Sequence, residues 1–166
     1  MNKKGITLQP FLFIMALFVM IMVVVFGTKS IMDIKGAADF TELSLFITNL
    51  KDEAQIFYHF DIGSSKLSRL GLPSNIEFVC FTNPGTTPTI PISDPFFKSI
   101  LENNARNNVF ILPLDSYDLT AFTIPYLMIE REENPLCIRT AGILEAELET
   151  TLTDDNNIAV TIRREV

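Results

Sequence analysis

The distribution of apolar residues divides the chain into an N-terminal segment without polar side chains and a longer region of mixed pattern. Every side chain from Phe11 to Phe26 is apolar, and Ile6 and Leu8 extend the run toward the N-terminus. About 20 helical residues cover about 30 Å, the thickness of the hydrocarbon core of a bilayer. Each Leu, Ile, Phe or Val at depth favours insertion by roughly 0.3 to 0.6 kcal/mol. The pattern therefore predicts a transmembrane helix over residues 6–27 rather than a buried core helix.

A second helical pattern follows in residues 28–60. Apolar residues recur there at helical spacing, which predicts an amphipathic helix whose apolar stripe needs a cover. The stripe consists of Leu43, Phe46, Ile47, Leu50, Ala54 and Phe57. Gly36 predicts a kink or break between the two helical patterns. Asp39 and Glu42, three residues apart, resemble a capping box at the start of the second helix.

Residues 61–166 alternate between short apolar runs and turn residues, which is typical of an antiparallel β-rich domain. We expect a hairpin formed by Lys66–Leu72 and Ile76–Phe81, and a three-stranded meander at the end of the chain. The meander comprises Leu136–Thr140, Ile143–Leu152 and Ile158–Arg164. The predicted fold class is α+β, with a transmembrane helix that continues into an amphipathic helix packed on the sheet.

The region between the hairpin and the meander has a less regular pattern. Four prolines in residues 83–95 predict an extended surface loop. The next stretch, Phe96–Asn104, predicts a short helix. The residues that this helix would turn inward are Phe97, Ile100 and Leu101. The unbroken apolar run Val109–Leu112 predicts a central strand, whereas Pro125 makes Phe122–Ile129 either an edge strand or a crossing segment.

Positive charge precedes the apolar run. Lys3, Lys4 and the amino terminus lie on its short side, and positively charged flanks tend to stay in the cytoplasm. We therefore expect a single-pass protein of the cell membrane, with a cytoplasmic N-terminus and the remainder outside the cell. A secretory signal removed near Val25-Phe26-Gly27 is the alternative, although its apolar core is usually only about 7 to 15 residues long.

The junction Lys3-Lys4-Gly5-Ile6, directly ahead of a long apolar helix, resembles the class III signal peptide of type IV pilins and archaeal pilin-like proteins. The resemblance covers about the first 30 residues. It implies that a prepilin peptidase removes residues 1–5 by cutting between Gly5 and Ile6. It further implies that the apolar helix becomes the mature N-terminus and that other pilin subunits are partners.

One position departs from that family's pattern. Many pilins carry a glutamate at the fifth mature position, thought to meet the N-terminal amine of a neighbouring subunit. Counted from Ile6, this chain has Pro10 there, preceded by Gln9. A proline is tolerated in the first helical turn because that amide has no intrahelical acceptor. A proline in place of this glutamate makes filament assembly less favoured, but it does not affect the predicted cleavage.

Length and charge limit the function of the exterior part. The roughly 140 residues beyond the apolar helix suffice for one domain with a single core. Of the 13 basic residues, Lys3 and Lys4 belong to the leader, so 11 basic and 20 acidic residues follow it, and 11 minus 20 is −9. Such an acidic surface repels nucleic acid and anionic lipid headgroups. We therefore expect that the chain contacts the lipid bilayer through its apolar helix and does not bind nucleic acid.

Cys80 and Cys137 are the two cysteines, and each lies within an apolar run that predicts a strand. An even count outside the cell favours a disulfide between them. Two buried free thiols are the alternative. A metal pair is disfavoured because the short Cys-x-x-Cys spacing is missing and the chain has one histidine.

The sequence contains no constellation typical of an active site. His59 lies in an aromatic cluster without a nearby orienting partner, and Ser64-Ser65 lacks the context of a nucleophile elbow. The Asp154-Asp155-Asn156-Asn157 stretch reads as a hairpin turn rather than a calcium loop. Three carboxylates that alternate along one strand are interpreted as a solvated face: Glu145, Glu147 and Glu149. We therefore expect that the protein is not an enzyme and that it has no catalytic residues, no cofactor and no metal.

These patterns together favour a pilin-like, membrane-anchored surface subunit with a structural or adhesive role. Its parts would be a basic leader at 1–5, a transmembrane helix at 6–27, a helical stalk at 28–60 and an extracellular β-rich domain at 61–166. The alternative is a signal-anchored extracellular binding module that does not polymerise. The ligand of either protein is unknown from these residues.

Overall fold

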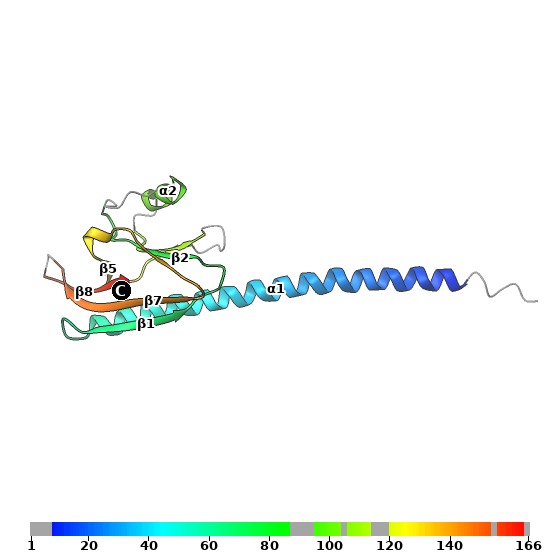
Figure 1. The fold of residues 1–166 in the computed structure, drawn as a ribbon, viewed down its shortest axis with the longest axis horizontal. Coiled ribbons are helices and arrows are strands. Elements are labelled where there is room, and N and C mark those ends of the chain that lie inside the picture. The colour runs from blue at the N-terminus through cyan, green and yellow to red at the C-terminus, as the bar shows by residue number, and fades with distance from the viewer. Residues whose placement is uncertain (1–7, 87–94, 104–105, 114–119, 154–155, 165–166) are drawn as a thin grey trace, which may run out of the picture. The chain divides into compact units, whose positions relative to one another are not determined.

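The computed structural model describes residues 8–86, 95–103, 106–113, 120–153 and 156–164. The chain divides into two compact units, Met1–Phe40 and Thr41–Val166. The first contains the apolar part of helix α1, which spans Leu8–Tyr58. The second contains the end of α1 and all the strands (Figure 1). The fold class is α+β, as the sequence predicted.

Helix α1 is uninterrupted between its first and last residues, which corrects two expectations. The break predicted at Gly36 is not there, and Asp39 lies inside the helix rather than at an N-cap. A glycine in a helix interior costs only about 1 kcal/mol relative to alanine, which the hydrogen bonds of neighbouring turns outweigh. The amphipathic stripe is confirmed, because Leu43, Phe46, Leu50, Ala54 and Phe57 are buried in the core.

Two four-stranded sheets make up most of the second unit. Sheet A has the order β1-β7-β8-β5, and sheet B has the order β4-β3-β2-β6. The pairs are antiparallel except β5 with β8, which is parallel. The strands of sheet A are β1 (Ser65–Gly71), β7 (Ile143–Leu152), β8 (Ile158–Arg164) and β5 (Leu127–Ile129). Those of sheet B are β4 (Ala121–Phe122), β3 (Val109–Leu112), β2 (Phe78–Phe81) and β6 (Leu136–Arg139).

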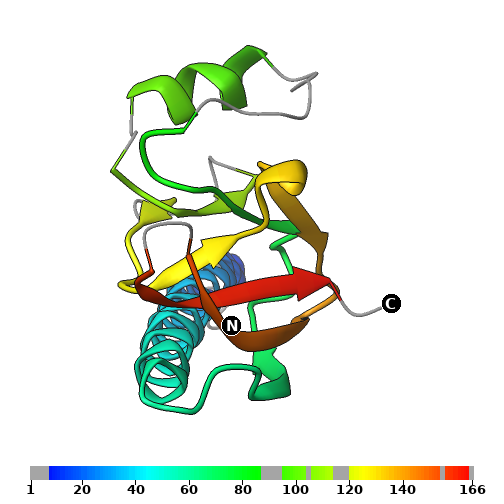
Figure 2. The same cartoon turned by 90° about the vertical axis from the view of Figure 1, so that its left-hand side faces the viewer.

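The two sheets differ in how many of their faces are buried. Strand β7 of sheet A alternates strictly, with Leu144, Ala146 and Leu148 in the core and glutamates on the outer face. In sheet B, Val79 and Ile111 face the same core, whereas Cys80 and Phe110 form a second cluster with helix α2, Pro95–Asn103. Figure 2 shows α2 lying over the side of sheet B that faces away from sheet A. Sheet B is therefore covered on both faces and sheet A on one.

The predicted strand pairings are partly wrong. Strand β1 pairs with β7 rather than with β2, so the expected hairpin does not form. The expected meander is also split, because β6 belongs to sheet B and only β7 and β8 form a hairpin. The links at Leu72–Ile76 and at Gly142 lead from one sheet to the other, and both Leu72 and Ile76 are buried. Alternation along a strand reports which side chains are buried, but it does not report the neighbouring strand.

The remaining predictions agree with the fold where the structure describes them. Helix α2 turns its apolar residues toward sheet B, and β3 lies between β4 and β2. Residues 121–129 cross from the edge of sheet B to the edge of sheet A, so both alternatives for that segment hold. The charged stretch 130–135, between β5 and β6, contains a short 3-10 helix, η1 (Arg131–Glu133). Most of the predicted 83–95 loop lies outside the described residues.

Candidate functional site

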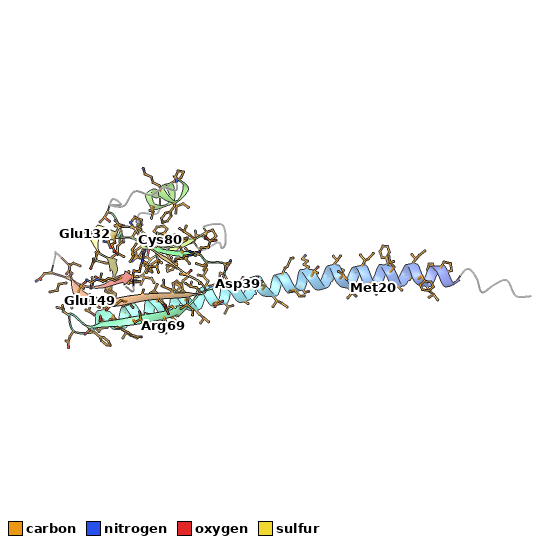
Figure 3. The ribbon with its side chains drawn as sticks, in the orientation of Figure 1. Met20, Asp39, Arg69, Cys80, Glu132 and Glu149 are labelled. Atoms are coloured by element: carbon orange, nitrogen blue, oxygen red, sulfur yellow. A yellow bond between two sulfur atoms is a disulfide. The ribbon has the colours of Figure 1, made fainter. Side chains whose placement is uncertain are left out.

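The apolar part of α1 is exposed on all sides within its own unit. Every large apolar side chain between Phe11 and Phe26 is at least 52% exposed. Figure 3 shows such side chains, Met20 among them, standing out from the helix. By length and composition, α1 is long and apolar enough to cross a membrane. The hydroxyl of Thr28 donates to the carbonyl of Val24 at 2.9 Å, so this polar group is satisfied within the helix.

The predicted cleavage site precedes Leu8, the first residue that the structure describes. Gly5 and Ile6 are outside the described residues, as are Lys3 and Lys4. Pro10 is within the first turn of α1, where its missing N–H leaves no helical acceptor unpaired.

The two cysteines form a disulfide. Cys80 on β2 lies directly opposite Cys137 on β6, and their Cα atoms are 4.0 Å apart. Three positions along the same ladder, Glu77 and Thr140 form a hydrogen-bonded pair, with Thr140 N donating to Glu77 O at 2.8 Å. Since hydrogen-bonded and non-hydrogen-bonded pairs alternate, the cysteines occupy a non-hydrogen-bonded pair, the closer of the two arrangements. The predicted proximity of these two strands is therefore confirmed.

A hollow of about 660 Å³ lies on the outer face of sheet A beside Tyr126, and we call it the Tyr126 hollow. Its size falls within the range of pockets that bind small ligands. Strand β5, the β7–β8 hairpin and the start of the 83–86 loop form its walls. The residues that line it include Tyr126, Thr151, Leu152, Asn157, Ile158 and Thr161.

Two buried asparagines hold the chain that forms one wall of this hollow. The amide of Asn108 donates to the carbonyls of Ile124 and Leu127 at 2.8 and 2.9 Å, and its oxygen accepts from Ile124 N. The amide of Asn83 donates to Ile129 O and its oxygen accepts from Ile129 N, both at 2.8 Å. These bonds replace the pairing that a further strand would provide, so residues 124–129 are anchored at both ends.

Tyr126 occupies a backbone conformation that bulky residues rarely adopt. Its φ is +66°, in the left-handed region, which costs about 1 to 2 kcal/mol for a residue with a side chain. The ring stacks on Tyr58 with centroids 3.9 Å apart and planes inclined by 22°. Its carbonyl accepts from Val160 N at 2.8 Å. Strain of this kind persists where the surroundings determine the conformation, as the two asparagines do here.

Ion pairs neutralise part of the glutamate row on the outer face of sheet A. Arg69 Nε lies 3.0 Å from Glu145, and Arg163 contacts both Glu149 and Glu130. Figure 3 places Arg69 and Glu149 on the strands of this sheet. The sequence predicted the shared face of Glu145, Glu147 and Glu149 correctly, but it did not supply the arginine partners. The row is a partly exposed, charge-paired surface and does not form a converging acid and base set.

The other residues considered from the sequence do not converge on one site. The rings of His59 and Tyr58 form a T-shaped pair with centroids 5.4 Å apart. Ser64 lies in a turn, where its N–H donates to Asp61 O at 3.0 Å. Within the described part of the chain, no group of three or more His, Cys, Asp or Glu could hold a metal ion. Asp154 and Asp155 lie outside the described residues.

Sequence reasoning missed the residues that shape the Tyr126 hollow. Asn108 directly precedes an apolar strand and Asn83 follows one, and a polar residue at such a position is a signal for a buried hydrogen bond. Tyr126 follows Pro125, but nothing local indicates a positive φ for a tyrosine. Their grouping depends on contacts between residues far apart in the chain, such as Asn83 and Ile129, which are 46 positions apart.

Comparison with known proteins returns no relative. No protein-family model matches the chain. No curated protein and no solved structure matches it either.

Proposed function

We propose that this chain is a pilin-like, single-pass membrane protein that serves as a structural or adhesive subunit at the cell surface. The observation that carries the proposal is the exposed apolar surface of residues 11–26, which requires an apolar cover that water cannot provide. The basic-Gly-apolar junction at Lys3 to Ile6 supports the pilin-like assignment. A helix followed by a disulfide-linked β-rich domain is the element order expected of that class.

Processing by a prepilin peptidase tests this function. Membranes that contain the full chain are incubated with the peptidase, and the mass of the product is measured. The expected product begins at Ile6, and Gly5→Trp prevents its formation. Gly36→Trp is the matched control, since a Cβ atom at Gly36 meets nothing within 4 Å, and its cleavage should equal that of the wild type. An uncut wild-type chain, or equal cutting of Gly5→Trp, contradicts the assignment.

The proposed orientation places residues after Gly27 outside the cell, where disulfides persist. The disulfide between Cys80 and Cys137 supports it. Intact membranes are alkylated before reduction, and the cysteine peptides are then identified by mass spectrometry. A cross-linked Cys80–Cys137 peptide is expected, whereas two alkylated thiols would argue for a reducing, cytoplasmic location.

A second candidate is a signal-anchored binding module that does not polymerise. Pro10 favours it, because a proline cannot form the ion pair that a glutamate makes with a neighbouring subunit's amine. Electron microscopy of cells that express the chain distinguishes the two candidates. Filaments labelled by an antibody against the β-rich domain exclude the binding module, and their absence from cells with a processed chain excludes the filament subunit.

A further inference from the structure

We infer that the Tyr126 hollow binds a neutral oligosaccharide. The hollow combines an anchored aromatic ring, hydroxyl and amide groups, and a volume of about 660 Å³. The inference goes beyond the proposed function, because it concerns a ligand of the β-rich domain and does not depend on leader cleavage or on filament assembly.

The aromatic component is Tyr126. Tyr58 covers one face of its ring, and the residue as a whole remains 47% exposed. The face of an aromatic ring carries negative partial charge, so it attracts the weakly positive C–H groups on the face of a pyranose ring. Asn83 and Asn108 anchor the backbone on both sides of Tyr126, so little conformational entropy is lost when a sugar stacks on it.

The polar component lies on the adjacent hairpin. The hydroxyls of Thr151 and Thr161 share one hydrogen bond of 2.6 Å, so the accepting hydroxyl keeps a proton for a further acceptor. The side-chain amide of Asn157 is exposed and has no hydrogen-bond partner among the described residues. Hydroxyls and amides that both donate and accept match the hydroxyl groups of a sugar.

Strand spacing places these components within reach of one ligand. Residue 126 lies beside Ala159 by continuation of the β5–β8 register, and Ala159 lies opposite Thr151. Neighbouring strands are about 4.8 Å apart, so the backbones of Tyr126 and Thr151 are separated by about 10 Å across the sheet. The small side chain of Ala159 lies between them and lines the hollow. One or two sugar rings fit this spacing.

Charge selects a neutral sugar over an acidic one. The charged residues among those that line the hollow are Glu130 and Glu132, both acidic. Arg163 pairs with Glu130 and reduces the local charge, but it is not part of the lining described. A sialylated or sulfated sugar would therefore bring like charges together, at a cost that falls as salt is added.

An extended peptide is disfavoured as the ligand, because side chains of this chain already bind the backbone groups on the outer edge of β5. A peptide that adds to a sheet edge pairs with the outward N–H and C=O groups of the edge strand. Here Ile129 N and O are bonded to Asn83, and Leu127 O is bonded to Asn108. The strand that a peptide would extend is closed by side chains of this chain.

The test uses the purified full chain in detergent micelles on a printed array of neutral hexose and N-acetylhexosamine oligosaccharides, with their sialylated and sulfated counterparts. Binding to at least one neutral glycan is expected, with weaker binding to its acidic counterpart at low salt. The affinity for the best glycan is then measured by calorimetry. Tyr126→Ala should lower it about tenfold, and Tyr126→Phe should change it by no more than about threefold.

Two further variants separate recognition from folding. Thr151→Val keeps the volume and removes one hydroxyl, and it should weaken binding about threefold to tenfold. Leu67→Ala is the matched control, since Leu67 is 39% exposed on β1, the opposite edge strand of sheet A, and its affinity should be unchanged. Circular dichroism checks that each variant is folded.

Three outcomes would overturn the inference. The first is an array without neutral-glycan binding. The second is glycan binding that Tyr126→Ala leaves unchanged in a folded variant. The third is preferential binding of an apolar peptide library that Thr151→Val does not affect, which would identify the hollow as a peptide site. None of these results bears on leader cleavage, so failure here and failure of the proposed function are distinguishable.

Discussion

Residues 11–26 and the apolar stripe within residues 43–57 belong to the same helix, and both present large apolar side chains, yet those side chains have opposite surroundings. In the first stretch each large apolar side chain is at least 52% exposed, whereas Leu43, Phe46, Leu50 and Phe57 are at most 4% exposed. The second stretch has polar residues on its other face, so sheets can cover its single apolar stripe. The first has apolar residues all round, and under the proposed function only lipid or other subunits can cover it.

The largest contrast is expected from shortening one phenylalanine in each stretch. Phe46→Ala leaves a cavity in the core of the β-rich domain and should lower its free energy of unfolding by about 3 to 5 kcal/mol. Phe18→Ala removes an exposed ring from the apolar stretch and should leave that stability unchanged. Pulse proteolysis of each full-length variant in micelles with increasing urea measures the difference. Equal losses in both variants would contradict the division of α1.

The disulfide should stabilise only the second unit. Cys80 and Cys137 are separated by 57 positions, and closing such a loop is worth about 4 kcal/mol in the chain-entropy model. The double replacement Cys80→Ala with Cys137→Ala should therefore lower the urea midpoint of the β-rich domain. Membrane extraction of the same variant at alkaline pH should match the wild type, because the apolar stretch is unchanged. Loss of membrane association would show that anchoring depends on the folded domain.

A charge placed in each stretch tests which one enters the bilayer. Val19→Arg should disfavour membrane insertion by about 2.5 to 3.5 kcal/mol, because an arginine at the helix centre must be removed from water. Leu45→Arg is the control, since Leu45 is 57% exposed in the second stretch and its substitution should not change insertion. The fraction of chain integrated into microsomes is the measurement. Equal integration of Val19→Arg and the wild type would remove the transmembrane assignment.

The smallest effect concerns a hydroxyl near the end of α1. The buried Thr150 hydroxyl on β7 donates to Phe57 O at 2.9 Å, linking sheet A to the last turn of the helix. Thr150→Val should cost about 1 kcal/mol of unfolding free energy, because the Phe57 carbonyl loses one buried hydrogen bond and keeps only the bond from Phe60 N. Thr48→Val removes an exposed bond to Ser44 O within α1 and should change stability by less than about 0.5 kcal/mol. Urea denaturation followed by tyrosine fluorescence compares the two.

Local patterns predicted most elements but not their partners. The stripe from Leu43 to Phe57, the short helix α2 and the central strand β3 follow from period and composition, which depend on neighbours in the chain. The pairing of β1 with β7 was not predicted, because β1 was expected to pair with β2. The proximity of β2 and β6 was predicted only because each strand carries a cysteine. The strand after Pro73 and the strand after Gly142 could each pair with more than one neighbouring strand. The alternation of apolar and polar residues does not distinguish among these neighbours.

The sequence by itself determined the apolar segment, the amphipathic end of α1, the α+β class and the two cysteines that pair. The tertiary structure alone decided the strand order of the two sheets, the arginine partners of the glutamate row and the Tyr126 hollow. The physical reason is the separation along the chain of the residues that interact. Burial and helical period are properties of adjacent residues, whereas Asn83 reaches Ile129 only after the sheets have brought together segments 46 positions apart. A buried amide finds its partner through that closure, and the sequence pattern around it carries no record of which carbonyl it will meet.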